Sequence, residues 1–161
     1  MKYPIGIQSF ERIIEDGYVY VDKTHLIYDL THSGSIYFLS RPRRFGKSLL
    51  VSTLENYYLG RKELFKGLAM EKLEKEWNVH PVFHVDFNGA NFTKEGVLET
   101  MLEDYVNKWE KQYGLHTNRE LETGLRFRDV LKSAHEQMGH RAVVLIDEYD
   151  KPILDVLLSL I

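Results

Sequence analysis

The sequence predicts an α/β fold in which a parallel sheet is flanked by helices. Two apolar runs with the features of strands, residues 82–87 and 142–146, alternate with segments whose apolar residues recur at helical spacing. A third apolar run, Ile36 to Leu39, lies directly before a polar segment and another helical pattern. Strands that alternate with helices are typical of parallel sheets, which bind their ligands at the carboxyl ends of the strands.

The composition is that of an ordinary globular protein. The 161 residues are 43% hydrophobic and 28% charged, which suits one domain with its own core. A net charge of −3 gives no general attraction for nucleic acid or an anionic membrane. The chain has no cysteine, which excludes disulfides, thiolate metal sites and cysteine nucleophiles. Because no apolar stretch is long enough for a signal peptide or a membrane span, we expect a cytoplasmic protein.

The first predicted strand leads through a polar loop into a helix. A turn at Gly34 precedes the Ile36–Leu39 run, which we interpret as a buried strand. From Ser48 to Leu59 the apolar and aromatic residues recur at helical spacing. Gly60 then ends the pattern, as glycine does at many helix C-termini.

The second half of the sequence predicts two strands separated by two helices. The strand Val82–Phe87 is followed by helical patterns over residues 97–113 and 125–138. The five apolar residues from Ala142 to Ile146 then end at Asp147. This uninterrupted apolar run predicts a central parallel strand that is buried on both faces.

The polar segment after the first strand matches the second half of the phosphate-binding loop pattern G-x-x-x-x-G-K-[ST]. Gly46 lets the backbone approach an oxyanion, and the amides that open the next helix, Lys47 to Leu49, point at phosphate. Lys47 is predicted to reach the β- and γ-phosphates, and Ser48 to offer its hydroxyl to Mg²⁺. Arg41 replaces the first glycine of the pattern, so the entry to the loop must differ from the usual geometry. The residues predicted to bind the nucleotide are Arg41, Pro42, Arg43, Arg44, Phe45, Gly46, Lys47, Ser48 and Leu49.

Two adjacent carboxylates, Asp147 and Glu148, follow the last predicted strand. In ATPases with a phosphate-binding loop, the first carboxylate holds Mg²⁺ through its water shell and the second polarises the attacking water. Ser48 and Asp147 are therefore the predicted metal ligands, and Glu148 and Lys47 the predicted catalytic residues. A carboxylate pair at a strand end is otherwise often a solvated turn, so this interpretation requires both clusters to meet around one triphosphate.

Several other interpretations stay open at this point. The arginines of residues 41–44 offer an alternative contact for nucleic acid, although no aromatic stacking platform accompanies them. Asp22 and Thr24 either contact the nucleotide or cap a helix. His80 and His84 have the spacing of one strand face, for which ordinary packing is a better interpretation than a metal site.

Four segments that span nearly the whole chain are similar to one known family. They are Tyr3–Phe10, Tyr20–Thr24, Phe38–Ser48 and Ile146–Pro152. Through them the chain resembles the predicted AAA-ATPase-like proteins of bacteria and archaea, for which the run Arg-Pro-Arg-Arg-Phe-Gly-Lys-Ser is a specific marker. The arginine at position 41 then follows the pattern of the family. The resemblance implies a P-loop NTPase-like fold that uses ATP and Mg²⁺.

The resemblance also implies that residues 1–161 are one P-loop ATPase-like domain, the N-terminal fragment of a longer protein. Relatives commonly end in a restriction-endonuclease-like nuclease domain, and ATPases with a catalytic glutamate need a further strand with a polar sensor residue. We therefore expect a fold truncated after the Walker B strand, with weak or absent hydrolysis. The expected partners are ATP and, in the longer protein, the linked nuclease domain; a sheet edge exposed by truncation could also create an artificial dimer. The alternatives are a nucleotide-binding regulatory or interaction module without turnover and a small-molecule phosphotransferase.

Overall fold

The computed structural model describes residues 1–40, 42, 45–116 and 119–158. The chain forms two compact units, residues 1–80 and 81–161, and each is described by itself. Three of the predicted nucleotide-binding residues, Arg41, Arg43 and Arg44, lie outside the described residues. Within the part of the chain that is described, no helix combines the length and the apolar character needed to cross a membrane.

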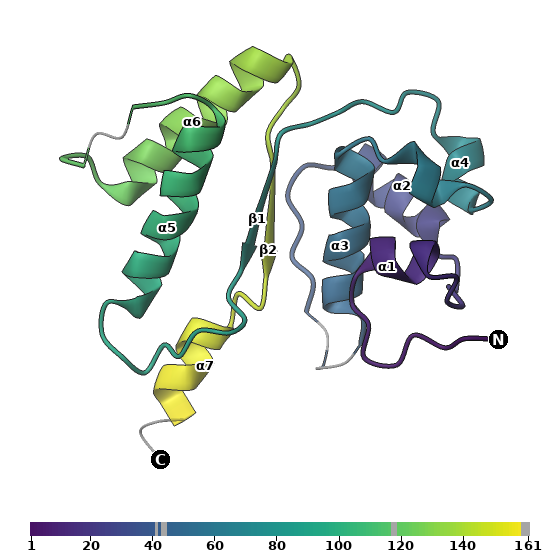
Figure 1. The fold of residues 1–161 in the computed structure, drawn as a ribbon, viewed down its shortest axis with the longest axis horizontal. Coiled ribbons are helices and arrows are strands. Elements are labelled where there is room, and N and C mark those ends of the chain that lie inside the picture. Colours follow the sequence, from purple (N-terminus) through teal and green to yellow (C-terminus); the bar gives the residue numbers. More distant parts are fainter. Residues whose placement is uncertain (41, 43–44, 117–118, 159–161) are drawn as a thin grey trace. The chain divides into compact units, whose positions relative to one another are not determined.

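The first unit is helical. Its elements are α1 (Phe10–Glu15), α2 (Thr24–Ser33), α3 (Lys47–Tyr58), the 3-10 helix η1 (Lys62–Phe65) and α4 (Ala69–Leu73) (Figure 1). The core of the unit forms around Phe10 and Phe65, which are fully buried and whose ring centroids lie 4.9 Å apart. The helix predicted after the phosphate loop is confirmed as α3, and Gly60, with φ of 70°, directly follows its C-cap Leu59.

Asp22 and Thr24 fasten the first turns of two helices. Asp22 Oδ1 accepts hydrogen bonds from the Thr24 backbone N–H at 2.8 Å and from the Thr24 hydroxyl at 2.7 Å, at the start of α2. Asp22 Oδ2 accepts from the backbone N–H of Ala69 at 2.7 Å, and Thr24 Oγ1 from that of Met70 at 2.9 Å, at the start of α4. Burial opposes ionisation of Asp22, but these hydrogen bonds outweigh it and lower the pKa of the carboxyl. The capping interpretation is confirmed in part: Asp22 binds the first amide of α2, but the N-cap residue is Lys23, and Thr24 Oγ1 binds an amide of α4.

Glu74 is a buried carboxylate that ties α3 to the segment after α4. Its side chain is 7% exposed and accepts a hydrogen bond of 2.5 Å from the Tyr57 hydroxyl and one of 2.9 Å from the Glu76 backbone N–H. His32 Nε2 lies 3.7 Å from the same carboxylate. Burial works to raise the pKa of the Glu74 carboxyl, but the hydrogen bonds from Tyr57 and the backbone outweigh it and lower the pKa. The ionised form of Glu74 therefore stabilises the fold.

Replacing Glu74 by Gln is expected to reduce the loss of stability in acid. Because the folded-state pKa of Glu74 lies below the unfolded value of about 4.3, its contribution is present above that value and is lost as the pH falls through the folded-state pKa. Urea unfolding at neutral pH and at about pH 4 measures the loss of unfolding free energy in acid, which should be smaller for Glu74→Gln than for wild type. The exposed neighbour Glu76→Gln serves as the control, and a wild-type difference in Glu74→Gln would contradict the assignment.

The second unit joins helices to a parallel sheet. Its elements are β1 (Val82–Asp86), α5 (Val97–Gln112), α6 (Thr123–Met138), β2 (Val143–Asp147) and α7 (Lys151–Leu158) (Figure 1). The strands pair in parallel, with Val82 opposite Val143 and Asp86 opposite Asp147. These two strands, their parallel direction and the two helices between them are confirmed as predicted.

The helices α5 and α6 cover β1 through aromatic side chains. Phe83 is fully buried, and its ring lies 5.1 Å from that of Trp109 on α5 and 6.0 Å from that of Phe127 on α6, measured between centroids. Val85 belongs to the same core. Removal of this apolar surface from water is the main force that holds the helices on the sheet.

A buried ion pair also joins α5 to α6. The Arg126 Nε–H donates to Glu110 Oε1 at 2.9 Å, and Nη2 donates to Glu110 Oε2 at 2.7 Å and to Asn107 Oδ1 at 2.5 Å. Arg126 and Glu110 are each 3% exposed. The guanidinium thus meets its carboxylate in the two-point geometry that compensates best for lost hydration.

Two predictions about the strands are wrong. Residues Ile36–Leu39 form no strand, and the side chain of Ile36 is 93% exposed, because an apolar run becomes a strand only where its backbone joins a ladder. The second strand is not buried on both faces, since Val144 and Ile146 are 39% and 50% exposed. In the described residues β2 has one neighbouring strand, and α5 and α6 pack over β1 instead. The finer P-loop topology therefore stays a prediction.

Candidate functional site

The described part of the predicted phosphate loop leads into α3 through a left-handed glycine. Gly46 adopts a left-handed conformation, with φ of 75° and ψ of 22°, and acts as the N-cap of α3. A Cβ at this position would meet nothing within 4 Å, so the backbone angle and not crowding is what favours glycine. The intrahelical ladder starts with the Leu50 N–H, which donates to the Gly46 carbonyl oxygen at 3.0 Å. The preceding amides, Lys47 to Leu49, open the positive end of the helix dipole.

The start of α3 is anchored to the core of its own unit. Leu49 packs against the cluster around Phe10, and the Leu49 carbonyl oxygen accepts a hydrogen bond of 2.7 Å from the Thr53 hydroxyl. One turn further on, Ser52 Oγ accepts from the Phe10 backbone N–H at 3.0 Å. Of the other predicted residues, Pro42 and Phe45 are exposed and Lys47 and Ser48 are half-buried. A fixed helix start with accessible polar side chains can hold a phosphate group without rearranging first.

The acidic pair lies in a turn between β2 and α7. Asp147 is the last residue of β2, is 7% exposed and accepts a hydrogen bond of 3.0 Å at Oδ1 from the Glu148 N–H. The Asp147 carbonyl oxygen accepts from the Phe87 N–H at 3.2 Å, which continues the ladder from β1. The Glu148 carbonyl oxygen accepts from the Lys151 N–H at 2.9 Å, which closes the turn. The turn therefore leaves the Glu148 carboxylate and the second Asp147 oxygen for other partners.

Glu148 has an unusual backbone conformation. Its φ is 52°, and among the described residues it is the one residue other than glycine with a positive φ. A left-handed conformation costs a residue with a Cβ about 1 kcal/mol. Strained positions of this kind occur often at functional sites, where the surrounding structure maintains them. The conformation is consistent with a constrained carboxylate beside Asp147.

A buried oxygen of Asp150 adds to the acidic turn. Asp150 Oδ1 is shielded from solvent and has no hydrogen-bond partner among the described residues. Native structures satisfy most buried polar atoms, so such an oxygen fits a site that a ligand completes. Carboxylate, hydroxyl and water oxygens are the ligands that Mg²⁺ prefers, so the donors at the turn and at Ser48 suit this ion.

The structure places the two predicted clusters in different units, with Gly46, Lys47 and Ser48 in the first and Asp147 and Glu148 in the second. Their meeting around one triphosphate stays a prediction. Among the described residues, no group of three His, Asp or Glu side chains is arranged to hold a metal ion. Mg²⁺ keeps several waters and takes few protein ligands, so the prediction does not require such a group.

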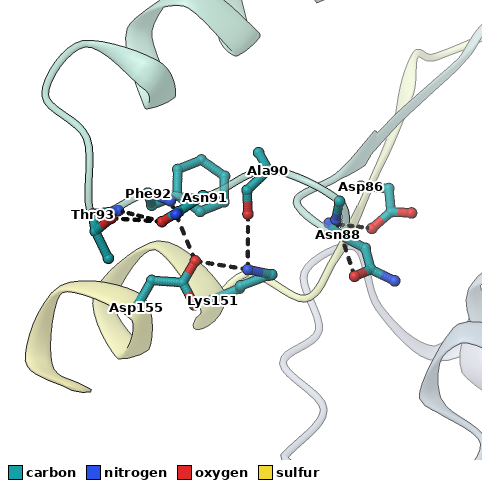
Figure 2. Close-up of polar contacts among 9 residues, drawn as sticks. Asp86, Asn88, Ala90, Asn91, Phe92, Thr93, Lys151 and Asp155 are labelled. Carbon is teal, nitrogen blue, oxygen red and sulfur yellow. Dashed lines mark hydrogen bonds and ion pairs between the residues drawn. The ribbon is translucent and has the colours of Figure 1, made fainter. Parts of the chain in front are cut away.

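Two features of the turn were missed from the sequence. One is the conformation of Glu148, for which the sequence carries no signal. The other is a polar contact between α7 and the loop that follows β1, made by Lys151 and Asp155 (Figure 2). The spacing of four residues between these opposite charges is a recognisable helical signal.

Comparison with known proteins identifies one family over most of the chain. The family described as "Predicted AAA-ATPase" matches residues 4–159. A protein of Azotobacter chroococcum mcd 1, described as "Uncharacterized protein in vnfD 5'region", is 43% identical over 155 residues, which cover 96% of this chain and 30% of that protein. The chain therefore spans less than a third of the length of this relative. No solved structure matches the chain.

Proposed function

Because the chain belongs to the family of predicted AAA-ATPases, we propose that it binds ATP with Mg²⁺ and couples the nucleotide to a conformational change. In this proposal the amides at the start of α3 and the Lys47 ammonium bind the phosphates. Ser48 and Asp147 hold the hydrated Mg²⁺, and Glu148 polarises the attacking water. The metal would supply charge stabilisation at the phosphates.

The observation that carries the proposal is the backbone at Gly46. A left-handed glycine followed at once by Lys47, Ser48 and the first turn of α3 is the arrangement that presents several N–H groups and one ammonium to a single anion. The anchoring of Leu49 in the core supports the proposal, because a fixed helix start loses little entropy when it binds phosphate.

The acidic turn supports the second half of the proposal. Asp147 keeps one carboxylate oxygen bonded to the Glu148 N–H, which leaves the other to bind a water of the Mg²⁺ shell. The left-handed backbone of Glu148, with φ of 52°, is a strained conformation of the kind that occurs often at functional sites. Two neighbouring carboxylates can then serve the metal and the water separately.

The larger context of the ATPase is also a proposal. In this proposal a nuclease domain is linked in the longer protein, as the resemblance implies, and the edge of the two-stranded sheet is a surface where copies of the domain could associate. A module that binds the nucleotide without turnover is the main alternative. The two differ in the role of Glu148, which is tested by mutation below.

Replacing Lys47 by Ala is expected to weaken ATP binding by about ten- to a hundredfold, because it removes a charge-assisted contact to phosphate. Titration calorimetry with ATP and Mg²⁺ on wild type and on Lys47→Ala measures the change. The matched control is Lys66→Ala, which removes an exposed lysine from the same unit and should leave the affinity unchanged. Equal affinity in wild type and Lys47→Ala would remove Lys47 from the site.

A further inference from the structure

The loop that follows β1 is fastened to α7 by a charged contact (Figure 2). Lys151 Nζ donates to the Ala90 carbonyl oxygen at 2.9 Å and to Asp155 Oδ2 at 2.7 Å. The same oxygen of Asp155 accepts from the Phe92 backbone N–H at 3.3 Å. The Lys151 and Asp155 side chains are 26% and 22% exposed. This partial shielding makes the contact stronger than an ordinary surface ion pair.

The loop itself is held on both sides of this contact. Phe92 is 6% exposed and packs edge-on against Phe87, with ring centroids 5.9 Å apart. The Lys151 ammonium lies 5.5 Å from the centroid of the Phe92 ring. At the start of the loop, Asp86 Oδ1 accepts a hydrogen bond of 2.8 Å from the Asn88 N–H. The segment from the end of β1 to Phe92 therefore forms a defined support.

Lys151 also closes the turn that carries the acidic pair. Its backbone N–H donates to the Glu148 carbonyl oxygen at 2.9 Å. The Glu148 N–H is bonded to Asp147 Oδ1, and the Asp147 carbonyl oxygen is bonded to the Phe87 N–H. Lys151 thus closes the turn with its backbone N–H and binds the loop that follows β1 with its side chain. Lys151 therefore links the turn that carries the carboxylates to the loop that follows β1.

We propose that Lys151 and Asp155 are positioning residues for Asp147 and Glu148. The inference rests on the proposed function, in which these carboxylates serve Mg²⁺ and the attacking water. The Lys151 ammonium donates hydrogen bonds to Ala90 and Asp155. We therefore expect it to affect nucleotide binding through the position of the two carboxylates and not by direct contact with phosphate. Its removal should weaken the response to Mg²⁺ and leave metal-free binding at Lys47 intact.

The test measures ATP binding by the whole chain in EDTA and across a series of Mg²⁺ concentrations. Lys151→Met and Asp155→Asn are expected to raise the Mg²⁺ concentration for half-maximal response about tenfold, as loss of a supporting contact to a metal ligand does. The affinity in EDTA should stay at the wild-type value. Lys151→Arg retains charge and donors, so it should restore most of the response. A destabilised fold would instead change both measurements together.

Lys132→Met is the matched control. Lys132 forms an ion pair at the same spacing with Glu136 on α6, and their side chains are 74% and 61% exposed. This control loses the same charge and should keep the wild-type response to Mg²⁺. If Lys151→Met responds to Mg²⁺ as Lys132→Met does, the positioning role is overturned.

Amide hydrogen exchange separates failure of the inference from failure of the proposed function. A wild-type chain that binds no ATP would overturn the proposed function, and with it the connection to Mg²⁺. The positioning of the turn is then judged from exchange at Phe92 and Glu148, which should be faster in Lys151→Met than in Lys132→Met. Equal exchange in the two variants would overturn the positioning role whatever the nucleotide result.

Discussion

In the longer protein that this domain is proposed to belong to, Glu148→Gln is expected to lower ATP hydrolysis by about a hundredfold or more, because an amide cannot accept the proton of the attacking water. ATP affinity should stay at the wild-type value, since the phosphate contacts are assigned to the start of α3. Gln has the same shape as Glu and tolerates the left-handed φ of 52° no better, so the substitution changes the chemistry and keeps the backbone cost. Phosphate release at saturating Mg-ATP measures the effect.

The control for this prediction is Glu136→Gln, which changes an exposed carboxylate on α6. It should hydrolyse ATP at the wild-type rate. Equal turnover in wild type and Glu148→Gln would contradict the assignment of Glu148 as the base. ATP binding without turnover in either protein is the result expected of the regulatory module.

Arg126→Met is expected to destabilise the protein by about 3–5 kcal/mol, because it leaves the Glu110 carboxylate buried without its cation. The two residues are each 3% exposed and joined by two hydrogen bonds of 2.9 and 2.7 Å. A loss of this size is a large fraction of the stability of about 5–15 kcal/mol that is typical of globular proteins. Urea unfolding followed by circular dichroism measures it.

Arg128→Met provides the control on the same helix. Arg128 is 71% exposed and pairs with Asp129 at 3.4 Å, so its loss should cost well below about 1 kcal/mol. The double variant Arg126→Met with Glu110→Leu should recover part of the lost stability, because it removes the buried carboxylate as well. A cost for Arg126→Met no larger than that for Arg128→Met would show that the buried pair contributes little.

The helices α3, α5 and α6 and both strands of the second unit are predicted from the sequence, the helices by a repeated apolar period and the strands by short apolar runs. The terminal helix α7 is not predicted. The helices α3, α5 and α6 are long enough for their apolar faces to repeat several times. Shorter elements such as η1 and α4, of four and five residues, contain little more than one turn and show no period. Their positions depend on tertiary contacts such as the hydrogen bond from Ala69 to Asp22.

The errors have a common physical origin. An apolar run indicates that its side chains favour burial, but it does not indicate which part of the protein they pack against. The pattern therefore predicts burial for Ile36, Tyr37 and Phe38 and for Val144 and Ile146, all of which are exposed in the structure. For the candidate site, motif spacing predicts Gly46 and the acidic pair as site residues, and their role stays a prediction. The support from Lys151 was missed because it depends on a loop distant in sequence.

The parallel pairing of β1 with β2 has a consequence for the order of folding. Val82 can meet Val143 only after the whole crossover between them has been closed, whereas α5 and α6 are neighbours along the chain. We expect the helical hairpin to assemble early and the strand contact to form late, since pairing of distant segments limits the rate of folding. The last segment to gain its shape would then be the turn of Asp147 and Glu148 beyond β2, so the two carboxylates would reach their final arrangement only when folding is complete.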